Sequence, residues 1–187
     1  MADGLESLGQ GSGKTRGYFA IGAEQISKPM NLGNMVRSAH AFGASFVFTV
    51  GAAHDLLNVG SNTSRSPRHV PLYHWPTPQE MALPQGCQLV GIELVEGAVD
   101  LPSFRHPLQA AYVLGPERGE LSPEILGLCD HVVKIPTAFC INVAVAGAIV
   151  MYDRVKTLGR FAPPPVGAGG PVEDLAEHKH GGRFTRR

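Results

Sequence analysis

Three short segments of the 187-residue sequence place glycine or other small residues beside polar side chains that could take part in chemistry. They are residues 31–37 (NLGNMVR), 115–117 (GPE) and 140–142 (CIN). Glycine allows a backbone to approach a bound molecule closely. The guanidinium of Arg37 stays protonated in proteins, so it suits gripping phosphate oxygens or stabilising negative charge on oxygen better than removing a proton. Taken alone, an arginine in a helix is more often a solvated surface residue.

In this order the segments resemble the motifs of the SpoU/TrmH family of RNA ribose methyltransferases, within the SPOUT class. The family's first motif, N-x-G-x-x-x-R, is matched by residues 31–37. A strand ending in G-x-E is matched at residues 115–117, and a strand ending in Ile-Pro at residues 135–136. The last motif, S-L-N-V-S-x-A at the start of a helix, is matched by residues 140–146. The resemblance covers roughly residues 18–158.

The resemblance implies that S-adenosylmethionine donates a methyl group to a ribose 2′-hydroxyl. In this family the segments after three strands form a deep C-terminal trefoil knot, whose backbone groups hold the cofactor. By position, the cofactor loops are residues 93–97, 114–119 and 135–142. The resemblance assigns substrate orientation and positioning to the catalytic set Arg37, Asn31 and Asn142. It assigns cofactor binding to Glu93, Leu114, Gly115, Glu117, Gly119, Ile135, Cys140 and Ile141.

The sequence departs from the family pattern at three points. Cys140 stands where serine is usual, which is a modest change if only its backbone contacts the cofactor. Gly119 lies one place early, and Glu120 occupies the position where the family has glycine. The link between Ile135 and Cys140 is shorter than in many relatives.

A polar stretch at residues 61–69 (SNTSRSPRH) carries basic side chains and no acid. It is either a solvated loop or a set of contacts to RNA phosphates, and the sequence leaves both open. His74 and Trp75 follow the next predicted strand and could stack a base, although a tryptophan in the core is the more ordinary interpretation. The candidate RNA-binding residues of this stretch are Arg65, Arg68 and His69.

The elements that must position these residues are strands alternating with helices. Residues 77–80 (TPQE) form a capping box pattern, and Ser122 precedes Pro123 in a second helix start. In the last helix, Val145, Ile149 and Tyr152 fall at helical spacing and are predicted to face the core. The alternation predicts an α/β fold with a mostly parallel sheet covered by helices on both faces. Strands are expected at residues 17–21, 45–50, 70–73, 88–93, 109–114 and 131–135, and helices at 31–42, 52–58, 77–80, 122–129 and 142–158.

Length and composition predict one domain at residues 17–158, after a disordered segment (1–16) and before a flexible, Pro/Gly-rich basic tail (159–187). Sixteen basic and sixteen acidic residues cancel, but acids concentrate between residues 77 and 130, so the remainder can present a basic face. The three cysteines lie at no metal-ligand spacing, and no apolar run reaches membrane length. These features predict a cytoplasmic protein that binds neither metal nor membrane.

Together the sequence predicts a SAM-dependent 2′-O-methyltransferase that acts on tRNA, in preference to rRNA. A homodimer is expected, with an interface made by the last helix and the helix that bears Arg37. One alternative is a SPOUT enzyme that methylates a base nitrogen, which would more naturally use an aspartate near the site. The other is an RNA-binding protein without turnover, against which the intact Arg37, Glu117 and Asn142 argue.

Overall fold

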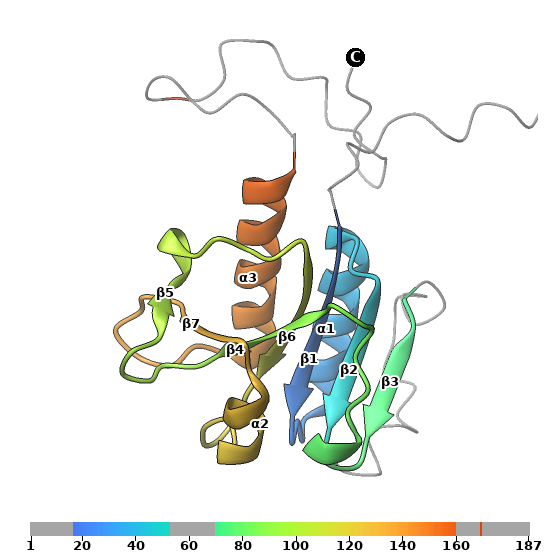
Figure 1. Cartoon of the computed structure of the whole chain (residues 1–187). Helices are drawn as coiled ribbons and strands as arrows, with labels where there is room; N and C mark the ends of the chain where they lie inside the picture. The colour runs from blue at the N-terminus through green and yellow to red at the C-terminus, as the bar shows by residue number, and fades with distance from the viewer. Residues whose placement is uncertain (1–16, 53–69, 160–168, 170–187) are drawn as a thin grey trace, which may run out of the picture.

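A seven-stranded sheet forms the centre of the protein (Figure 1). The structure is a computed structural model that describes residues 17–52, 70–159 and 169. The strand order is β3-β2-β1-β6-β4-β7-β5, and all six pairings are parallel, as predicted. The strands are β1 (Tyr18–Glu24), β2 (Phe46–Val50), β3 (Leu72–Trp75), β4 (Gln88–Ile92), β5 (Val99–Asp100), β6 (Gln109–Leu114) and β7 (His131–Lys134).

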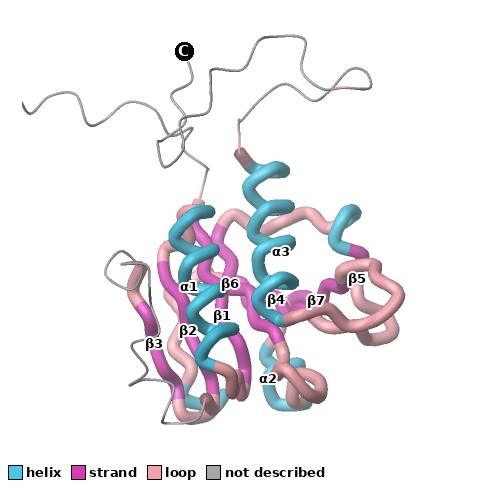
Figure 2. Tube along the Cα trace, turned by 180° about the vertical axis from the view of Figure 1, so that it is seen from behind, coloured by secondary structure: helices cyan, strands magenta, loops and turns pink. Residues whose placement is uncertain are grey.

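Helices cover both faces of the sheet, as predicted, but unequally. Two long helices, α1 (Pro29–Phe42) and α3 (Val143–Leu158), lie side by side on one face (Figure 2). Met35 from α1 and Val150 from α3 are fully buried in the larger core beneath them. The short helix α2 (Pro123–Leu128) packs on the opposite face with a smaller buried cluster. The deep knot implied by the resemblance stays a prediction.

Helix boundaries follow the capping residues that the sequence offers. α1 ends at Gly43, whose φ of 77° lies in the left-handed region that glycine adopts without strain. Ser122 caps α2 as predicted, because its hydroxyl accepts the amide of Ile125 at 3.1 Å. At residues 77–80 the prediction is wrong: the chain makes only a 3-10 turn, and the Thr77 hydroxyl donates to the Glu80 carboxylate instead of capping a backbone amide.

Two short elements were not predicted because they are too short to show a periodic pattern. β5 has two residues, and the 3-10 turn at Leu101–Ser103 directly follows it. The predicted helix at residues 52–58 falls outside the described residues apart from residue 52. The predicted disordered segment at residues 1–16 lies outside them too, as does the tail at 159–187 apart from residues 159 and 169.

The buried face of α3 differs from the predicted one. Val145 and Tyr152 were expected in the core but are 51% and 58% exposed. The helix instead turns its smaller residues to the sheet: a Cβ at Gly147 would lie 3.8 Å from the side chains of Ile21 and Leu114. Both stripes of α3 are apolar at helical spacing, so periodicity alone could not choose between them. The small residues face the sheet because they let the helix backbone pack close to it.

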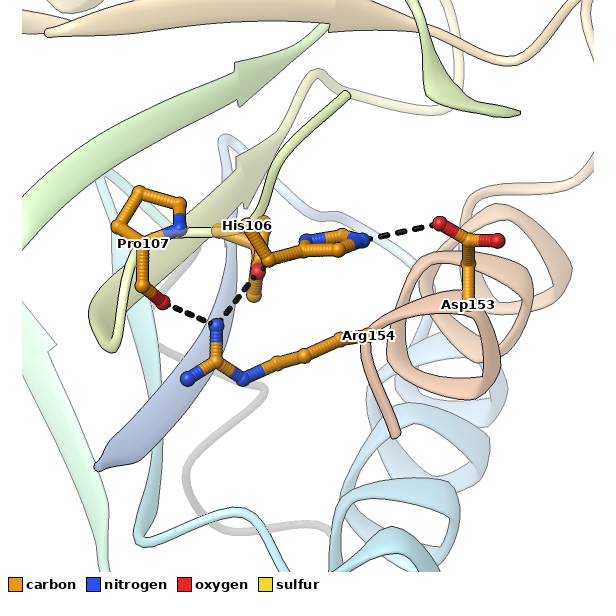
Figure 3. Close-up of polar contacts among 5 residues, drawn as sticks. His106, Pro107, Asp153 and Arg154 are labelled. Atoms are coloured by element: carbon orange, nitrogen blue, oxygen red, sulfur yellow. Dashed lines mark hydrogen bonds and ion pairs between the residues drawn. The ribbon is translucent and has the colours of Figure 1, made fainter. Parts of the chain in front are cut away.

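A buried polar cluster fastens the C-terminal half of α3 to the start of β6 (Figure 3). Arg154 is 1% exposed and donates from Nη1 to the carbonyl of Pro107 (2.6 Å) and the hydroxyl of Tyr112 (3.0 Å). Its Nη2 donates to the carbonyls of Tyr18 (3.1 Å) and Leu108 (2.9 Å). One guanidinium therefore satisfies acceptors at the beginning of both β1 and β6, which suits its forked donor geometry.

His106 completes this cluster, and its partners fix its tautomer. Because Arg154 can only donate, the Tyr112 hydroxyl accepts from it and donates its own proton to His106 Nδ1 (2.6 Å). Nε2 of His106 then donates to the carboxylate of Asp153 (2.9 Å). Burial lowers the pKa of His106, although Asp153 acts to raise it, and burial raises the pKa of Tyr112 to about 12. The network therefore favours the neutral forms of the His106 imidazole and the Tyr112 phenol.

We predict that Arg154→Met lowers the free energy of unfolding by about 3 kcal/mol, because four buried hydrogen bonds from the guanidinium are lost. Arg154→Lys should recover only part of this loss, since a single ammonium cannot reach acceptors on two strands. Urea denaturation measures both changes. Lys156→Met, at an exposed position of the same helix, is the matched control and should change stability by less than about 0.5 kcal/mol. Equal losses for Arg154→Met and Lys156→Met would refute this role.

Candidate active site

The three loops predicted to hold a cofactor follow strands that are neighbours in the sheet. β6, β4 and β7 lie side by side and run parallel, so their carboxyl ends meet at one edge (Figure 1). Loops 93–97, 114–119 and 135–142 start at that edge. Open parallel sheets bind ligands in crevices outside the carboxyl ends of their strands. The fold therefore gathers the three predicted loops at a position suited to a ligand.

Glu93 holds the loop that follows β6. Its Oε2 accepts the amide of Leu121 (2.8 Å), and its Oε1 accepts the amide of Leu94 (2.9 Å). Gly115 lies against this carboxylate, since a Cβ there would come within 3.1 Å of Glu93 Oε2 and 3.2 Å of the Leu121 nitrogen. The close packing favours glycine at residue 115, because a side chain there would require Glu93 or the Leu121 backbone to shift. The structure thus gives Glu93 an anchoring role, and its contact with a cofactor stays a prediction.

Glu24 anchors the same loop from β1 and was missed by the sequence analysis. It is 2% exposed, and its Oε2 accepts the amide of Ser122 at 2.8 Å. Its position at the end of a buried apolar strand could have indicated this role. A carboxylate that is buried needs hydrogen-bond donors nearby, and a neighbouring loop can supply them. Two carboxylates therefore fix the chain between β6 and α2.

Glu117 caps the first turn of α1 from a distant part of the chain. Lys28, the residue at the N-cap, provides no side-chain cap. The Glu117 carboxylate instead accepts the amide (3.0 Å) and hydroxyl (2.9 Å) of Ser27, the amide of Lys28 (2.9 Å) and Nδ2 of Asn31 (3.0 Å). Burial acts to raise the pKa of Glu117, but these hydrogen bonds outweigh it and lower the pKa to about 2. A carboxylate here also complements the helix dipole.

Asn31 extends this contact to α3. It is 6% exposed, and while its Nδ2 donates to Glu117, its Oδ1 accepts from Nδ2 of Asn142 (3.1 Å). Asn142 is the N-cap of α3, because its Oδ1 accepts the amides of Ala144 (2.9 Å) and Val145 (3.3 Å). A carboxamide can donate and accept at once, as both positions require. One chain of hydrogen bonds therefore joins the G-x-E loop to the first turns of both long helices.

Arg37 lies on the exposed face of α1, as predicted, and lines a groove between α1 and α3. Its side chain makes no hydrogen bond or ion pair with any described residue, so its charge is available to a ligand. Asn142 lines the same groove, so the structure brings the three predicted catalytic residues together. The groove has a volume of about 430 Å³, and its lining is mostly uncharged: Asn34, Arg37, Ser38, Asn142, Ala144, Val145, Ala148, Ile149 and Tyr152.

Beside this groove lie the three predicted cofactor loops, 93–97, 114–119 and 135–142, which form the predicted cofactor crevice and offer backbone groups more than side chains. Leu114 is buried, and Ile135 and Ile141 are partly buried against the core, so these predicted residues offer a ligand mainly their backbone. Gly119 has a φ of 114°, which glycine adopts without strain. The amides of Gly119 and Cys140 donate to no described residue. The arrangement fits a nucleoside-containing cofactor that is held by backbone contacts.

The match to a known family covers both the crevice and the groove. The pattern that defines the SpoU rRNA Methylase family matches residues 18–152. This chain belongs to the SpoU family. The matched region runs from β1 into α3 and includes every residue predicted for catalysis and for cofactor binding.

Known relatives of this SpoU-family chain act on different RNAs. The mouse tRNA (guanosine(18)-2′-O)-methyltransferase TARBP1 is 29% identical over 81% of this chain and 10% of its own length. The 23S rRNA (uridine(2479)-2′-O)-methyltransferase of Streptomyces viridochromogenes is 29% identical over 79% of this chain and 56% of its own. The structure of AviRb from that organism, in complex with AdoMet, has a TM-score of 0.67 and 26% identity, covering 83% of this chain and 62% of that one. The chain thus spans only part of each relative's length.

Some predictions fall outside what the structure describes. The candidate RNA-binding residues Arg65, Arg68 and His69 lie in the gap between residues 52 and 70. Within the described ranges, no group of three or more His, Cys, Asp or Glu residues could hold a metal ion. No helix in those ranges is long and apolar enough to cross a membrane.

We predict that Glu117→Gln lowers the free energy of unfolding at neutral pH by about 1–2 kcal/mol, because the new amide turns N–H groups toward backbone donors. The folded-state pKa of about 2 lies below the usual 4.5. The stabilisation is therefore complete above pH 4.5 and is lost as the pH falls toward 2. Denaturation at a series of pH values should show the variant and the wild type converging in that window.

Glu124→Gln is the matched control, since Glu124 is exposed in the first turn of α2 and its side chain makes no hydrogen bond within the described chain. It should change stability by less than about 0.5 kcal/mol. A Glu117→Gln deficit that stays constant as the pH falls to 2 would mean that the ionised carboxylate is not the stabilising species.

Proposed function

We propose that this protein transfers the methyl group of S-adenosylmethionine to a ribose 2′-hydroxyl of tRNA. The observation that carries the proposal is the hydrogen-bonded set Glu117, Asn31 and Asn142 beside the guanidinium of Arg37, which pairs with none of the described residues. Family membership supports ribose methylation, because the mouse and Streptomyces relatives are both 2′-O-methyltransferases. The AdoMet complex of AviRb supports the cofactor.

S-adenosylmethionine, when bound, supplies an activated methyl group on a sulfonium. The chain's own task is to present the ribose oxygen in line with that methyl group and to stabilise the charge that develops on the oxygen. Arg37 suits this task as an orienting and charge-stabilising group, since its guanidinium does not release its proton. Asn31 and Asn142 hold the first turns of α1 and α3 together, which fixes Arg37 relative to loop 135–142.

The choice of tRNA follows the mouse relative, while the Streptomyces relative acts on 23S rRNA. Assays on tRNA and ribosomal RNA discriminate between these substrates. Methylation of a base nitrogen is the weaker alternative, because none of the described residues that line the groove is an aspartate or a glutamate. A binding protein without turnover is disfavoured because the motif residues Arg37, Glu117 and Asn142 are all present.

We also infer a homodimer in which a second copy covers the groove between α1 and α3. Val145 and Tyr152 expose 51% and 58% of their surface on this face, and Ile149 lies between them. Apolar side chains gathered on one face commonly mark an association surface. A twofold interface here would be isologous and would place the Arg37 of each copy beside the partner chain.

We predict that Arg37→Ala leaves the fold and the affinity for S-adenosylmethionine nearly unchanged, since alanine is a good helix former at an exposed position. Methyl transfer to tRNA in single turnovers at saturating RNA should slow by about a hundredfold or more, on the order of 3 kcal/mol. Arg37→Lys should recover little of this rate, because an ammonium lacks the planar fork.

Arg105→Ala, at an exposed arginine that is not among the residues lining the groove, is the control and should keep the wild-type rate. Saturating RNA removes simple binding defects from the comparison. Wild-type turnover by Arg37→Ala under these conditions would show that Arg37 is not part of the reaction. If the wild type binds S-adenosylmethionine but methylates neither RNA, the proposed substrate is wrong.

We predict that Ile149→Asp converts a dimer into a monomer of about 20 kDa in sedimentation velocity, because a buried, unpaired carboxylate opposes association. Leu128→Asp, on the exposed surface of α2, should leave the dimer intact. A wild-type monomer at micromolar concentration with full methyl-transfer activity would exclude the dimer.

A further inference from the structure

We propose that Tyr73 and Trp75, on the edge strand β3, form a platform on which a base of single-stranded RNA stacks. The platform lies on the face of the sheet opposite α1 and α3, so it is separate from the groove that contains Arg37. The proposal rests on the RNA substrate inferred above and adds a second contact surface for that RNA.

The two rings are held parallel by the strand and by the rings beneath them. Alternate residues of a strand point to the same face, and the planes of Tyr73 and Trp75 differ by 9° with centroids 6.2 Å apart. Phe46 meets Tyr73 edge-to-face at 5.5 Å, and Phe48 packs against Trp75 at 5.3 Å. Both phenylalanines are buried in β2. A platform that is already rigid loses little conformational freedom when a base binds.

His74 does not belong to the platform, although it precedes Trp75 in the sequence. It points to the other face, where its Nδ1 lies 2.7 Å from the hydroxyl of Thr49. Burial lowers the pKa of His74, which disfavours its cationic form. The stacked pair is therefore Tyr73 with Trp75, two residues apart, and not the adjacent histidine and tryptophan.

Exposure and charge identify the partner as RNA. Tyr73 is 50% exposed and Trp75 is partly exposed, and β3 is the last strand on its side of the sheet (Figure 1). Residues 70–79, which include β3, contain no Asp or Glu that would repel a phosphate. Single-stranded nucleic acid is bound by aromatic rings that stack bases and by cations that contact phosphates. The exposed aromatic pair on β3 meets the first requirement, and the acid-free segment around it leaves room for phosphates.

The distance across the sheet makes this a remote contact. β3 lies three places from β6, the nearest strand that leads into a predicted cofactor loop, and adjacent strands are about 4.8 Å apart, so roughly 14 Å of sheet separate the two. One RNA can contact both only if it extends over several nucleotides. The platform would therefore add affinity for the RNA without taking part in methyl transfer.

The test uses Trp75, the only tryptophan in the sequence, as its own reporter. Titration of the full chain with an oligoadenylate of about ten nucleotides should quench its fluorescence, since sites of this kind span about 4–16 nucleotides. An abasic oligomer of equal length and charge should not quench it. Tyr73→Ala should weaken oligoadenylate binding about tenfold or more, and Tyr73→Phe, which keeps the ring, should bind like the wild type.

Leu128→Ala is the matched control, because Leu128 on α2 is 49% exposed, like Tyr73, but lies away from β3. It should bind oligoadenylate normally. Equal affinity of Tyr73→Ala and the wild type, or equal quenching by the abasic oligomer, would overturn the platform. If the Trp75 fluorescence is quenched as the protein concentration rises in the absence of RNA, a second copy of the chain occupies this surface. That result would also overturn the platform.

These outcomes are independent of the proposed methyl transfer. A protein that methylates no RNA but loses oligoadenylate quenching in Tyr73→Ala keeps the platform and loses the proposed function. A protein that methylates tRNA while Tyr73→Ala binds oligoadenylate normally keeps the function and loses the platform.

Discussion

The carboxylate of Glu117 is the contact on which the arrangement of the site depends. It replaces the side-chain cap that Lys28 cannot supply, and it does so from a loop 89 residues further along the chain. Its bond to Asn31 continues through Asn142 into the first turn of α3. The crevice loop and the two helices that form the groove are therefore positioned by the same hydrogen bonds, and a movement of one is resisted by the others.

The second long helix is held at both ends by polar contacts of different kinds. Asn142 fixes its N-terminus beside the predicted crevice. Arg154 and the Asp153–His106 pair fix its C-terminal half near the amino ends of β1 and β6. Between these anchors, small residues rest on the sheet and apolar residues face outward. A helix fixed in this way can expose an apolar stripe without rotating to bury it.

The fold and much of the site could be predicted from the sequence because strand patterns and motif residues are local signals. The gathering of Asn31, Glu117 and Asn142 followed from the family resemblance, but their mutual hydrogen bonds did not. The buried face of α3 was mispredicted because both of its stripes are apolar. Nothing local marks Arg154 as buried, since its partners are backbone carbonyls from distant segments. Such pairings exist only after the strands have assembled.

The central place of β6 in the sheet also governs the order in which the molecule can assemble. β6 lies between β1 and β4, and its ladder with β1 begins where Gln109 pairs with Tyr18. Before β6 has been synthesised, β1 has only β2 as a described neighbour and β4 has neither of its partners. A partly synthesised chain thus carries unpaired, apolar strand edges. Such edges favour aggregation, and the wait for a distant partner strand slows folding. Insertion of β6 closes both edges at once and joins the half that bears Arg37 to the half that forms the crevice.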